Sequence, residues 1–229
     1  AELQAKATAV LARVDPQLAA EFAALGQAQL LDLDNRPGKA PGGYCTFFAL
    51  ERRPYIFMNG IGQHNDVQIL LHEAGHAFHA VEAARLPFVQ QMSPPMEFNE
   101  VASMAMELLT APFLDTPGGF YTPAQAAQAR IEQLEQIILF WPYMAVIDAF
   151  QHWAYAHPEL AADPQRCDQR WHALWDRFMP GVDWSGMEAE LVTGWQRRLH
   201  VFRAPLYYVE YGLASLGAVQ VWRNALADP

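Results

Sequence analysis

The chain has 229 residues, of which 52% are hydrophobic, enough for one sizeable core or for one lobe of a larger core. Its formal net charge is −10 and it has no basic block, so nucleic acids and anionic membranes are not expected partners. No segment approaches the ~20 apolar residues of a membrane span, and no signal peptide or internal repeat is visible. Cys45 and Cys167 make no disulfide framework and favour a reducing, cytoplasmic compartment.

The N-terminal part is expected to be helical and then to form a β-hairpin. Residues 2–29 are predicted to form one or two helices. The two prolines and three glycines of residues 36–43 exclude regular structure, so this segment is either a mobile loop over a cleft or an ordinary connector. Segments 44–50 and 55–59 are rich in aromatic and β-branched residues, which predicts two strands. Lys39, in the loop, either meets a substrate carboxylate or is solvated.

The next predicted helix carries the most informative pattern in the chain, His72-Glu73-Ala74-Gly75-His76. Two histidines four residues apart lie on one helical face, so both imidazoles can reach a single metal ion. The glutamate between them lies beside that metal, where it can take a proton from a bound water. The alternative is a pair of core histidines, but the spacing and the intervening glutamate favour a metal. This pattern is typical of metal-assisted hydrolysis, most often of peptide bonds.

The helix around this motif is expected to be largely buried, because apolar residues surround the histidines on most sides. Asn65 is the expected N-cap, with Gln68 completing a capping box. Pro87 is expected to end the helix. His79 shares the face of the two histidines.

The third metal ligand has to come from elsewhere in the chain. Three ligands from two turns of one helix cannot easily surround a tetrahedral ion, which argues against His79. A metzincin would need Gly and His where this chain has His79 and Glu82, so that class is excluded. A carboxylate from a second helix is the remaining option.

That second helix is predicted to begin near Ser93 and to carry an acidic stripe. Glu97, Glu100 and Glu107 share one face, and carboxylates beside an apolar stripe are costly to bury unless they meet a cation. Glu100 is the predicted ligand. Glu107 is predicted to accept a hydrogen bond from a ligand histidine. Glu97 is equally well explained as a solvated residue in the first helical turn.

The remainder of the chain is also predicted to be helical. One long helix is expected over residues 122–156, with a possible kink at Pro142. A second is expected to open at Ser185 or Gly186 and to reach His200, and the last starts at Pro205. The tryptophans spread along these helices indicate core and helix–helix contacts.

Three blocks in order resemble the M3 family of zinc metallopeptidases, specifically its oligoendopeptidase F branch. The first is residues 72–79, similar to the family's extended zinc motif. The second is residues 99–103 together with Glu107, similar to the segment that carries the glutamate ligand. The third is residues 205–211, similar to the tyrosine-rich segment beside the family's active site. Residues 36–43 and the strands after them also resemble this family.

The resemblance implies a role for each matching residue. His72, His76 and Glu100 would hold one zinc ion per chain, with Glu73 as general base and then proton donor. Glu107 and His79 would lie just outside the ligands.

The match in the third block is looser, and it implies oxyanion stabilisation by a tyrosine helped by a histidine. Tyr208 and Tyr211 fit the tyrosine best, His200 is the expected histidine, and Tyr207 remains open as a residue that contacts substrate. Aromatic packing into a core is the alternative for these tyrosines.

The hairpin is the expected substrate-binding element. A strand edge near the metal can pair with an extended peptide, and the resemblance favours this over a hairpin that binds nothing. Gly42, Gly43 and Tyr44 are the expected contact residues.

The expected fold is therefore mainly α, a helical zincin-type catalytic lobe with a small β-hairpin or sheet beside the zinc helix. Residues 1–229 are expected to form a single catalytic region of a larger peptidase whose N-terminal half and extreme C-terminus are absent. The predicted function is a zinc endopeptidase acting on short peptides. The alternatives are a non-catalytic or incomplete peptide-binding fragment and a zinc exopeptidase with the same ligands.

Overall fold

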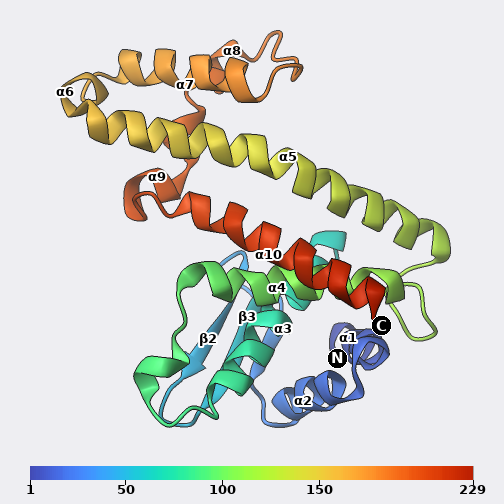
Figure 1. The fold of residues 1–229 in the computed structure, drawn as a ribbon. Coiled ribbons are helices and arrows are strands. Elements are labelled where there is room, and N and C mark those ends of the chain that lie inside the picture. The colour runs from blue at the N-terminus through green and yellow to red at the C-terminus, as the bar shows by residue number, and fades with distance from the viewer. Residues whose placement is uncertain (229) are drawn as a thin grey trace. The chain divides into compact units, whose positions relative to one another are not determined.

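The computed structural model describes residues 1–228 and is mainly helical with one small sheet (Figure 1). The N-terminal elements are α1 (Glu2–Val14), α2 (Pro16–Gln27), β1 (Leu31–Asp34), β2 (Gly43–Phe48), β3 (Arg53–Gly60), α3 (His64–Ala83), η1 (Val89–Met92), α4 (Met96–Thr110) and η2 (Ala111–Phe113). The C-terminal elements are α5 (Pro123–Ala156), α6 (Pro158–Ala161), α7 (Pro164–Phe178), α8 (Glu188–Val192), η3 (Gly194–Arg197), α9 (Leu199–Arg203) and α10 (Tyr208–Ala227). The mainly α fold with a small sheet is the predicted one.

The chain divides into two compact units. The first unit comprises Ala1–Glu132 and Ala214–Pro229, and the second comprises Gln133–Leu213. Helices α5 and α10 each begin in one unit and end in the other. The prediction of a single catalytic region remains a prediction.

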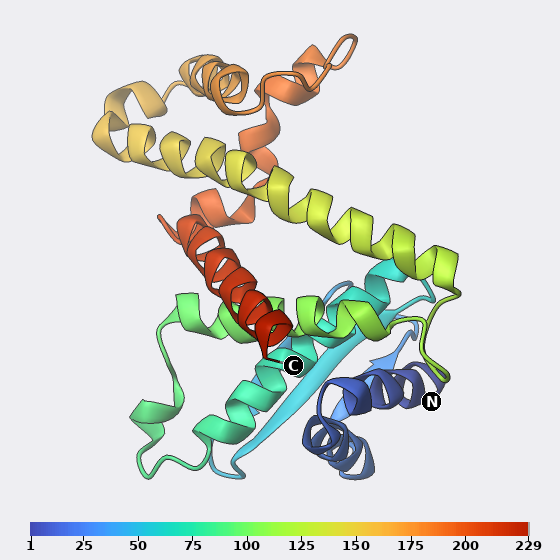
Figure 2. The same cartoon turned by 45° about the vertical axis from the view of Figure 1, so that its right-hand side comes forward.

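In the first unit, the sheet has the strand order β1-β3-β2. Strand β2 pairs with β3 antiparallel, with Cys45 opposite Ile56, and β1 pairs with β3 parallel, with Leu31 opposite Ile56. Helix α3 packs against β2, β3 and α4, and helices α1 and α2 lie side by side (Figure 2). The core between these elements includes Leu11, Phe22, Ile56, Met58, Leu70, Ala74 and Phe78, all buried. The zinc-motif helix is thus held against a sheet on its apolar side.

The hairpin prediction is confirmed with one addition, because β1 makes it a three-stranded sheet. Pro54 lies near the start of the central strand and not on an edge strand. It is tolerated because the pairing of β1 with β3 begins only at Ile56, so Pro54 faces β2 alone.

Several helix boundaries differ from prediction, including that of the last helix, which begins at Tyr208 and not at Pro205. Helix α3 begins at His64 with Gln63 as its N-cap and ends at Ala83, so Asn65 is not the cap and Pro87 lies beyond the end. Helix α4 begins at Met96, just after its prolines. The helix expected from residue 185 to His200 is instead three short pieces, α8, η3 and α9.

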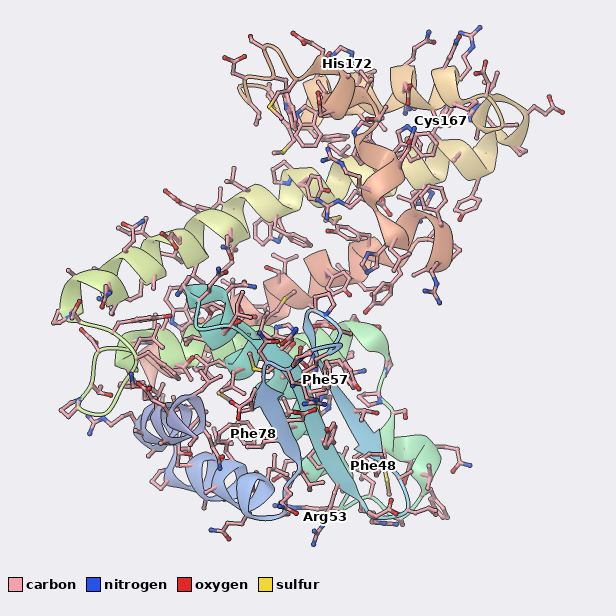
Figure 3. All side chains as sticks on the ribbon, turned by 180° about the vertical axis from the view of Figure 1, so that it is seen from behind. Phe48, Arg53, Phe57, Phe78, Cys167 and His172 are labelled. Atoms are coloured by element: carbon pink, nitrogen blue, oxygen red, sulfur yellow. The ribbon has the colours of Figure 1, made fainter. Side chains whose placement is uncertain are left out.

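The second unit is built around aromatic side chains. Its core includes Val146, Ile147, Phe150, Cys167, Trp171, Leu174 and Tyr208, with Trp153, Trp175 and Trp195 packed against them. Figure 3 shows Cys167 and His172 on α7, the helix that supplies two of these tryptophans. Trp153, Trp171, Trp175 and Trp195 are core residues, as predicted, whereas Trp141 is exposed. Among the described residues, no helix is both long and apolar enough to cross a membrane.

Candidate metal centre and active site

The structure brings His72, His76 and Glu100 together. The two histidines lie one turn apart on α3, with Nε2 of His72 3.2 Å and Nε2 of His76 3.5 Å from the same oxygen, Oε2 of Glu100 on α4. One ligand atom from each residue lies within 4.8 Å of the others. The three residues predicted as ligands therefore converge on one point between two helices.

Gly75 explains how α4 comes so close to the histidines. A Cβ placed on Gly75 would lie 2.6 Å from both the carbonyl oxygen of Ala102 and the Cα of Ser103. Any side chain there would push α4 away from α3. The glycine inside the motif thus serves the close helix contact that delivers Glu100.

The donor set fits a tetrahedral zinc ion. With zinc–nitrogen and zinc–oxygen bonds of about 2.0–2.2 Å, neighbouring ligand atoms lie about 3.3–3.5 Å apart. The separations of 3.2 Å and 3.5 Å at Glu100 match this closely. Two imidazoles and one carboxylate also leave a fourth position for water, as catalytic zinc sites do.

Two further side chains hold these ligands in place. The Nδ1–H group of His72 donates to Oε1 of Glu107 at 2.6 Å, which directs Nε2 toward the ligand cluster. Glu107 thus has the geometry that the prediction requires. The hydroxyl of Ser103, which is fully buried, donates to Oε2 of Glu100 at 3.0 Å.

The charges of this cluster are strongly coupled. Burial lowers the pKa of His72, but hydrogen bonds with Glu100 and Glu107 outweigh it and raise the pKa to about 10. Burial raises the pKa of Glu100, but His72 and His76 outweigh it and hold that pKa well below its usual range. The site therefore favours ionised carboxylates facing positive charge, which is the electrostatic preference of a cation site.

Glu73 has the environment expected of a general base. Its side chain is buried, and burial raises its pKa above the usual value, although His72 and His76 act in the opposite direction. The backbone of Cys45, in β2, also acts to lower this pKa, but less than burial raises it. A carboxylate with a raised pKa is a better proton acceptor near neutral pH.

Two other predicted neighbours lie on the same helices. His79 is half-buried on α3, and burial together with the nearby charge of His76 lowers its pKa. Glu97 lies in the first turn of α4, where a helix dipole favours a carboxylate.

The predicted substrate contacts lie at the start of the edge strand β2. Gly43 opens this strand, and a Cβ on it would lie 2.5 Å from Cγ2 of Ile69 on α3, so a glycine lets the strand approach the zinc-motif helix. Tyr44 is 51% exposed and stacks on Phe57, with ring centroids 5.0 Å apart. Figure 3 shows Phe57 and Phe48 on the neighbouring strands. In the described sheet, β2 pairs only with β3, so its other edge faces no strand.

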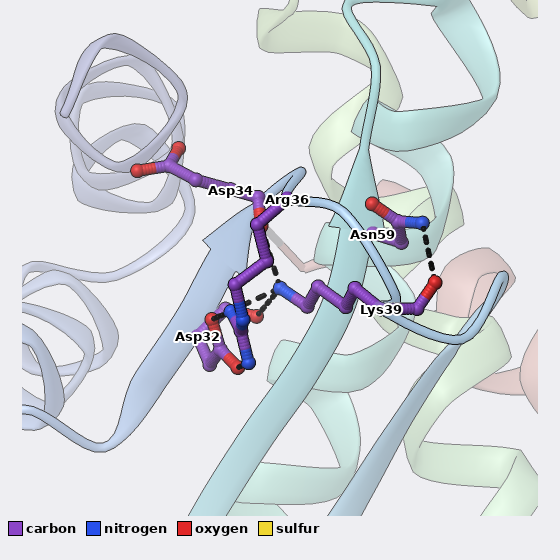
Figure 4. Close-up of polar contacts among 5 residues, drawn as sticks. All are labelled: Asp32, Asp34, Arg36, Lys39 and Asn59. Carbon is purple, nitrogen blue, oxygen red and sulfur yellow. Dashed lines mark hydrogen bonds and ion pairs between the residues drawn. The ribbon is translucent and has the colours of Figure 1, made fainter.

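The loop before β2 is anchored by a lysine (Figure 4). Nζ of Lys39 is buried and lies 2.9 Å from Oδ1 of Asp32, 3.1 Å from the Asp32 carbonyl oxygen and 2.7 Å from that of Asp34. Arg36 makes two further hydrogen bonds to the Asp32 carboxylate. Lys39 is therefore neither solvated nor available to a substrate carboxylate, and it fastens the loop to β1.

In the second unit, the predicted tyrosines and histidine form their own cluster. The ring centroid of His200 lies 6.0 Å from that of Tyr207, 5.2 Å from that of Tyr208 and 5.7 Å from that of Tyr211. Burial and Arg198 lower the pKa of His200, and burial raises that of Tyr208. The structure thus groups these four residues, while their catalytic roles remain predictions.

Sequence reasoning missed Gly75 and Ser103 as parts of this site. Gly75 was visible inside the motif, but its function depends on the distance to another helix. Ser103 lies three residues after Glu100, one helical turn away, and that spacing is the signal that points to it.

Comparison with known proteins identifies the family. Residues 20–229 match the model of peptidase family M3, and the chain belongs to that family. It is similar to Pz peptidase A, solved with an inhibitor, at 31% identity and a TM-score of 0.88. It is also similar to a candidate oligoendopeptidase F, at 31% identity and a TM-score of 0.88, and to another from Bacillus anthracis str. Ames, at 28% and 0.81.

The chain spans only part of these proteins. Each alignment covers 99% of this chain but 40%, 39% and 37% of the respective solved structures. No curated protein sequence matches it.

Proposed function

We propose that this chain is the catalytic region of a zinc-dependent endopeptidase that hydrolyses short peptides. The observation that carries the proposal is the convergence of His72, His76 and Glu100 beside the buried carboxylate of Glu73. Membership of peptidase family M3 and similarity to the oligoendopeptidase F structures support it.

Zinc held by His72, His76 and Glu100 would lower the pKa of a bound water toward neutrality and polarise the scissile carbonyl. Glu73 takes the proton from that water and delivers it to the leaving amine. The buried position of Glu73 and its raised pKa suit both steps. Glu107 fixes the tautomer of His72, and Ser103 orients Glu100.

The edge of β2 is the proposed binding surface for substrate. Gly42 is exposed, Gly43 opens the strand, and Tyr44 offers an exposed aromatic face. Antiparallel pairing would hold an extended peptide through its backbone and read little of its sequence. The roles of Tyr207, Tyr208, Tyr211 and His200 follow from the family resemblance. A cytoplasmic location is likewise part of the proposal.

The decisive variant is Glu73→Gln, which keeps the shape of the side chain and removes its basicity. We expect it to retain zinc and to lose hydrolysis of a short peptide blocked at both ends. Zinc per chain, measured by elemental mass spectrometry, and peptide cleavage, measured by chromatography, test both parts. A Glu73→Gln protein that cuts as fast as the parent would exclude this mechanism.

The blocked peptide also separates the two alternatives. An exopeptidase needs a free terminus and leaves such a peptide intact. An incomplete peptide-binding region, which the 40% coverage of Pz peptidase A favours, would bind the peptide without turnover at saturating zinc.

A further inference from the structure

The hydrogen bonds of the sheet determine which backbone groups of β2 are free. The N–H group of Asn59 in β3 donates to the carbonyl oxygen of Gly42 at 2.9 Å. Hydrogen-bonded pairs alternate with unbonded pairs along antiparallel strands, so the even-numbered residues of β2 turn their backbone groups toward β3. The odd-numbered residues turn theirs to the other edge, and these are Gly43, Cys45 and Phe47. Pro54, which lacks an N–H group, stands opposite Phe47 in an unbonded pair and agrees with this assignment.

This edge is open and passes beside Glu73. Among residues 1–228, no further strand or loop backbone pairs with Gly43, Cys45 or Phe47. The backbone of Cys45, the middle residue of the three, acts to lower the pKa of Glu73, the proposed general base. An extended peptide paired with this edge would therefore have its backbone next to Glu73 at the level of Cys45.

The side chains of β2 alternate between two faces of the sheet. Position 43 faces α3, since a Cβ on Gly43 would lie 2.5 Å from Cγ2 of Ile69, and Cys45 packs against the core on the same side. The even-numbered side chains therefore point away from α3. Two of them are aromatic and well exposed, Tyr44 at 51% and Phe48 at 45%.

Each of these exposed rings is supported by a ring of β3. Tyr44 stacks on Phe57 with an interplanar angle of 16°, and the ring centroids of Phe48 and Tyr55 lie 6.0 Å apart. Within the described residues, none of the four rings belongs to a hydrophobic core cluster. The outer face of the hairpin thus presents two supported aromatic positions, with Thr46 between them.

We propose that Tyr44 and Phe48 select peptides that carry two apolar side chains four residues apart, aromatic ones above all. This proposal rests on the proposed function, in which the substrate pairs antiparallel with β2. The peptide residues opposite Tyr44 and Phe48 would form unbonded pairs, in which Cα atoms are about 4.5 Å apart and side chains are closest. Backbone pairing alone reads little sequence, so these two contacts supply the selectivity.

The direction of the pairing also places the bond that is cut. In an antiparallel peptide, the residue opposite Phe48 comes first and the residue opposite Tyr44 comes four positions later. The residue between them that lies opposite Cys45 directly precedes the one opposite Tyr44, and Cys45 marks the level of Glu73. Cleavage is therefore expected beside the second of the two apolar residues.

Two blocked peptides of identical composition test the spacing. Each carries two phenylalanines among small polar residues, four residues apart in one peptide and three apart in the other. A spacing of four puts both rings on one side of an extended chain, whereas a spacing of three puts them on opposite sides. Dissociation constants are measured by calorimetry on the zinc-loaded Glu73→Gln protein, so that no turnover is needed. We expect the spacing of four to bind about twofold to tenfold more tightly, the effect of one additional aromatic contact.

Exposed aromatic residues supply matched variants. Tyr44→Ala and Phe48→Ala, each added to Glu73→Gln, should bring the ratio of the two dissociation constants close to one, because a single outer contact remains. Tyr155→Ala removes a ring that is 53% exposed on α5 and should leave both constants unchanged. Zinc content and circular dichroism of each variant show that it is folded. Mass spectrometry of the fragments made by the parent protein locates the cut.

The possible failures are distinguishable. Equal dissociation constants for the two peptides, a ratio that survives both substitutions, or no binding of either peptide would overturn the proposal. Cleavage far from the second phenylalanine would overturn the placement of Tyr44 next to the bond that is cut. A parent protein that binds the spacing of four more tightly and yet leaves both peptides intact would support this selectivity and overturn the proposed hydrolysis alone.

Discussion

At the residue scale, the metal cluster depends on groups that hold the ligands as much as on the ligands. Glu107 fixes which nitrogen of His72 carries the proton, and Ser103 fixes one oxygen of Glu100. Such supporting groups commonly change metal affinity by about tenfold to a hundredfold when they are replaced. Replacing the different glutamates of the acidic stripe on α4 is therefore expected to change zinc affinity by different amounts.

Glu107→Gln should lower zinc affinity by about tenfold to a hundredfold while the protein stays folded. The amide cannot accept from His72 as strongly as the carboxylate at 2.6 Å does. Glu97→Gln, in the first turn of the same helix, is the matched control and should leave the affinity unchanged. Competition with a zinc-binding dye measures both. Equal losses in the two variants would mean that α4 acts through its total charge.

Zinc uptake should release a proton from His72. In chelator-treated protein the pKa of His72 is about 10, so the imidazole is charged at pH 7, whereas a zinc ligand must be neutral. Zinc affinity should therefore rise with pH up to about 10. Calorimetry in two buffers of different ionisation enthalpy counts the proton. A binding enthalpy that does not depend on the buffer would contradict the expectation.

The raised pKa of His72 also predicts how the stability of the chelated protein depends on pH. The folded-state pKa of His72 lies above its ordinary value of 6.5. The stabilisation from the charged imidazole is therefore fully present below pH 6.5 and is lost as the pH rises through about 10. In urea unfolding of the chelated protein, the midpoint urea concentration should fall as the pH rises from 6.5 to about 10.

At the scale of elements, the start of α3 shows how a loop fixes the zinc-motif helix. Oδ2 of Asp66 accepts the backbone N–H groups of Ile61, Gly62 and Gln63 at 2.8, 2.6 and 2.9 Å. Asp66 is buried, and its negative charge lies at the positive end of the helix. The connection from β3 to α3 is thus closed around one carboxylate.

Asp66→Ala should lower the free energy of unfolding by about 1–3 kcal/mol, because it leaves three backbone donors unpaired and removes a helix cap. Asn65→Ala is the matched control, since Asn65 is exposed and is not the N-cap. It should change stability by less than about 0.5 kcal/mol. Denaturant unfolding of the two variants is the measurement. A larger loss of stability in Asn65→Ala than in Asp66→Ala would instead support Asn65 as the N-cap, the arrangement expected from the sequence.

At the scale of the whole molecule, the two units differ in the measurements that report on their folding. Six of the seven tryptophans lie in residues 133–213, and the metal cluster lies in the other unit. Tryptophan fluorescence therefore reports mainly on the second unit. Metal binding is coupled to the folding of the first.

Chelation should therefore lower the thermal midpoint measured by far-ultraviolet circular dichroism more than the midpoint measured by tryptophan fluorescence. The reason is that bound zinc stabilises only the folded form of the unit that holds it. Thermal scans with and without chelator, followed by circular dichroism and by tryptophan fluorescence, make the comparison. Identical shifts would show that the two units unfold as one.

Sequence reasoning reached the parts of this molecule that depend on local spacing. The histidine pair, Glu100 and the helical character followed from periodicity and ligand number. Strand β1 escaped prediction because it has only four residues and lacks β-branched side chains. The roles of Lys39 and Asp66 depend on partners brought together by loop conformation, including Gly62 at φ +86°. Such contacts have no fixed sequence spacing.

The division of the first unit into two segments has a consequence for its synthesis. Residues 214–229 complete a unit whose remainder ends at residue 132, and at Gly217 α10 lies so close to α4 that a Cβ would stand 2.8 Å from Val101. A ribosome adds about 5–20 residues per second, so the intervening roughly 80 residues take about 4–16 s. During that interval α4, the helix that carries Glu100, lacks its contact with α10. Nascent chains stalled before residue 214 should therefore present α4 to chaperones.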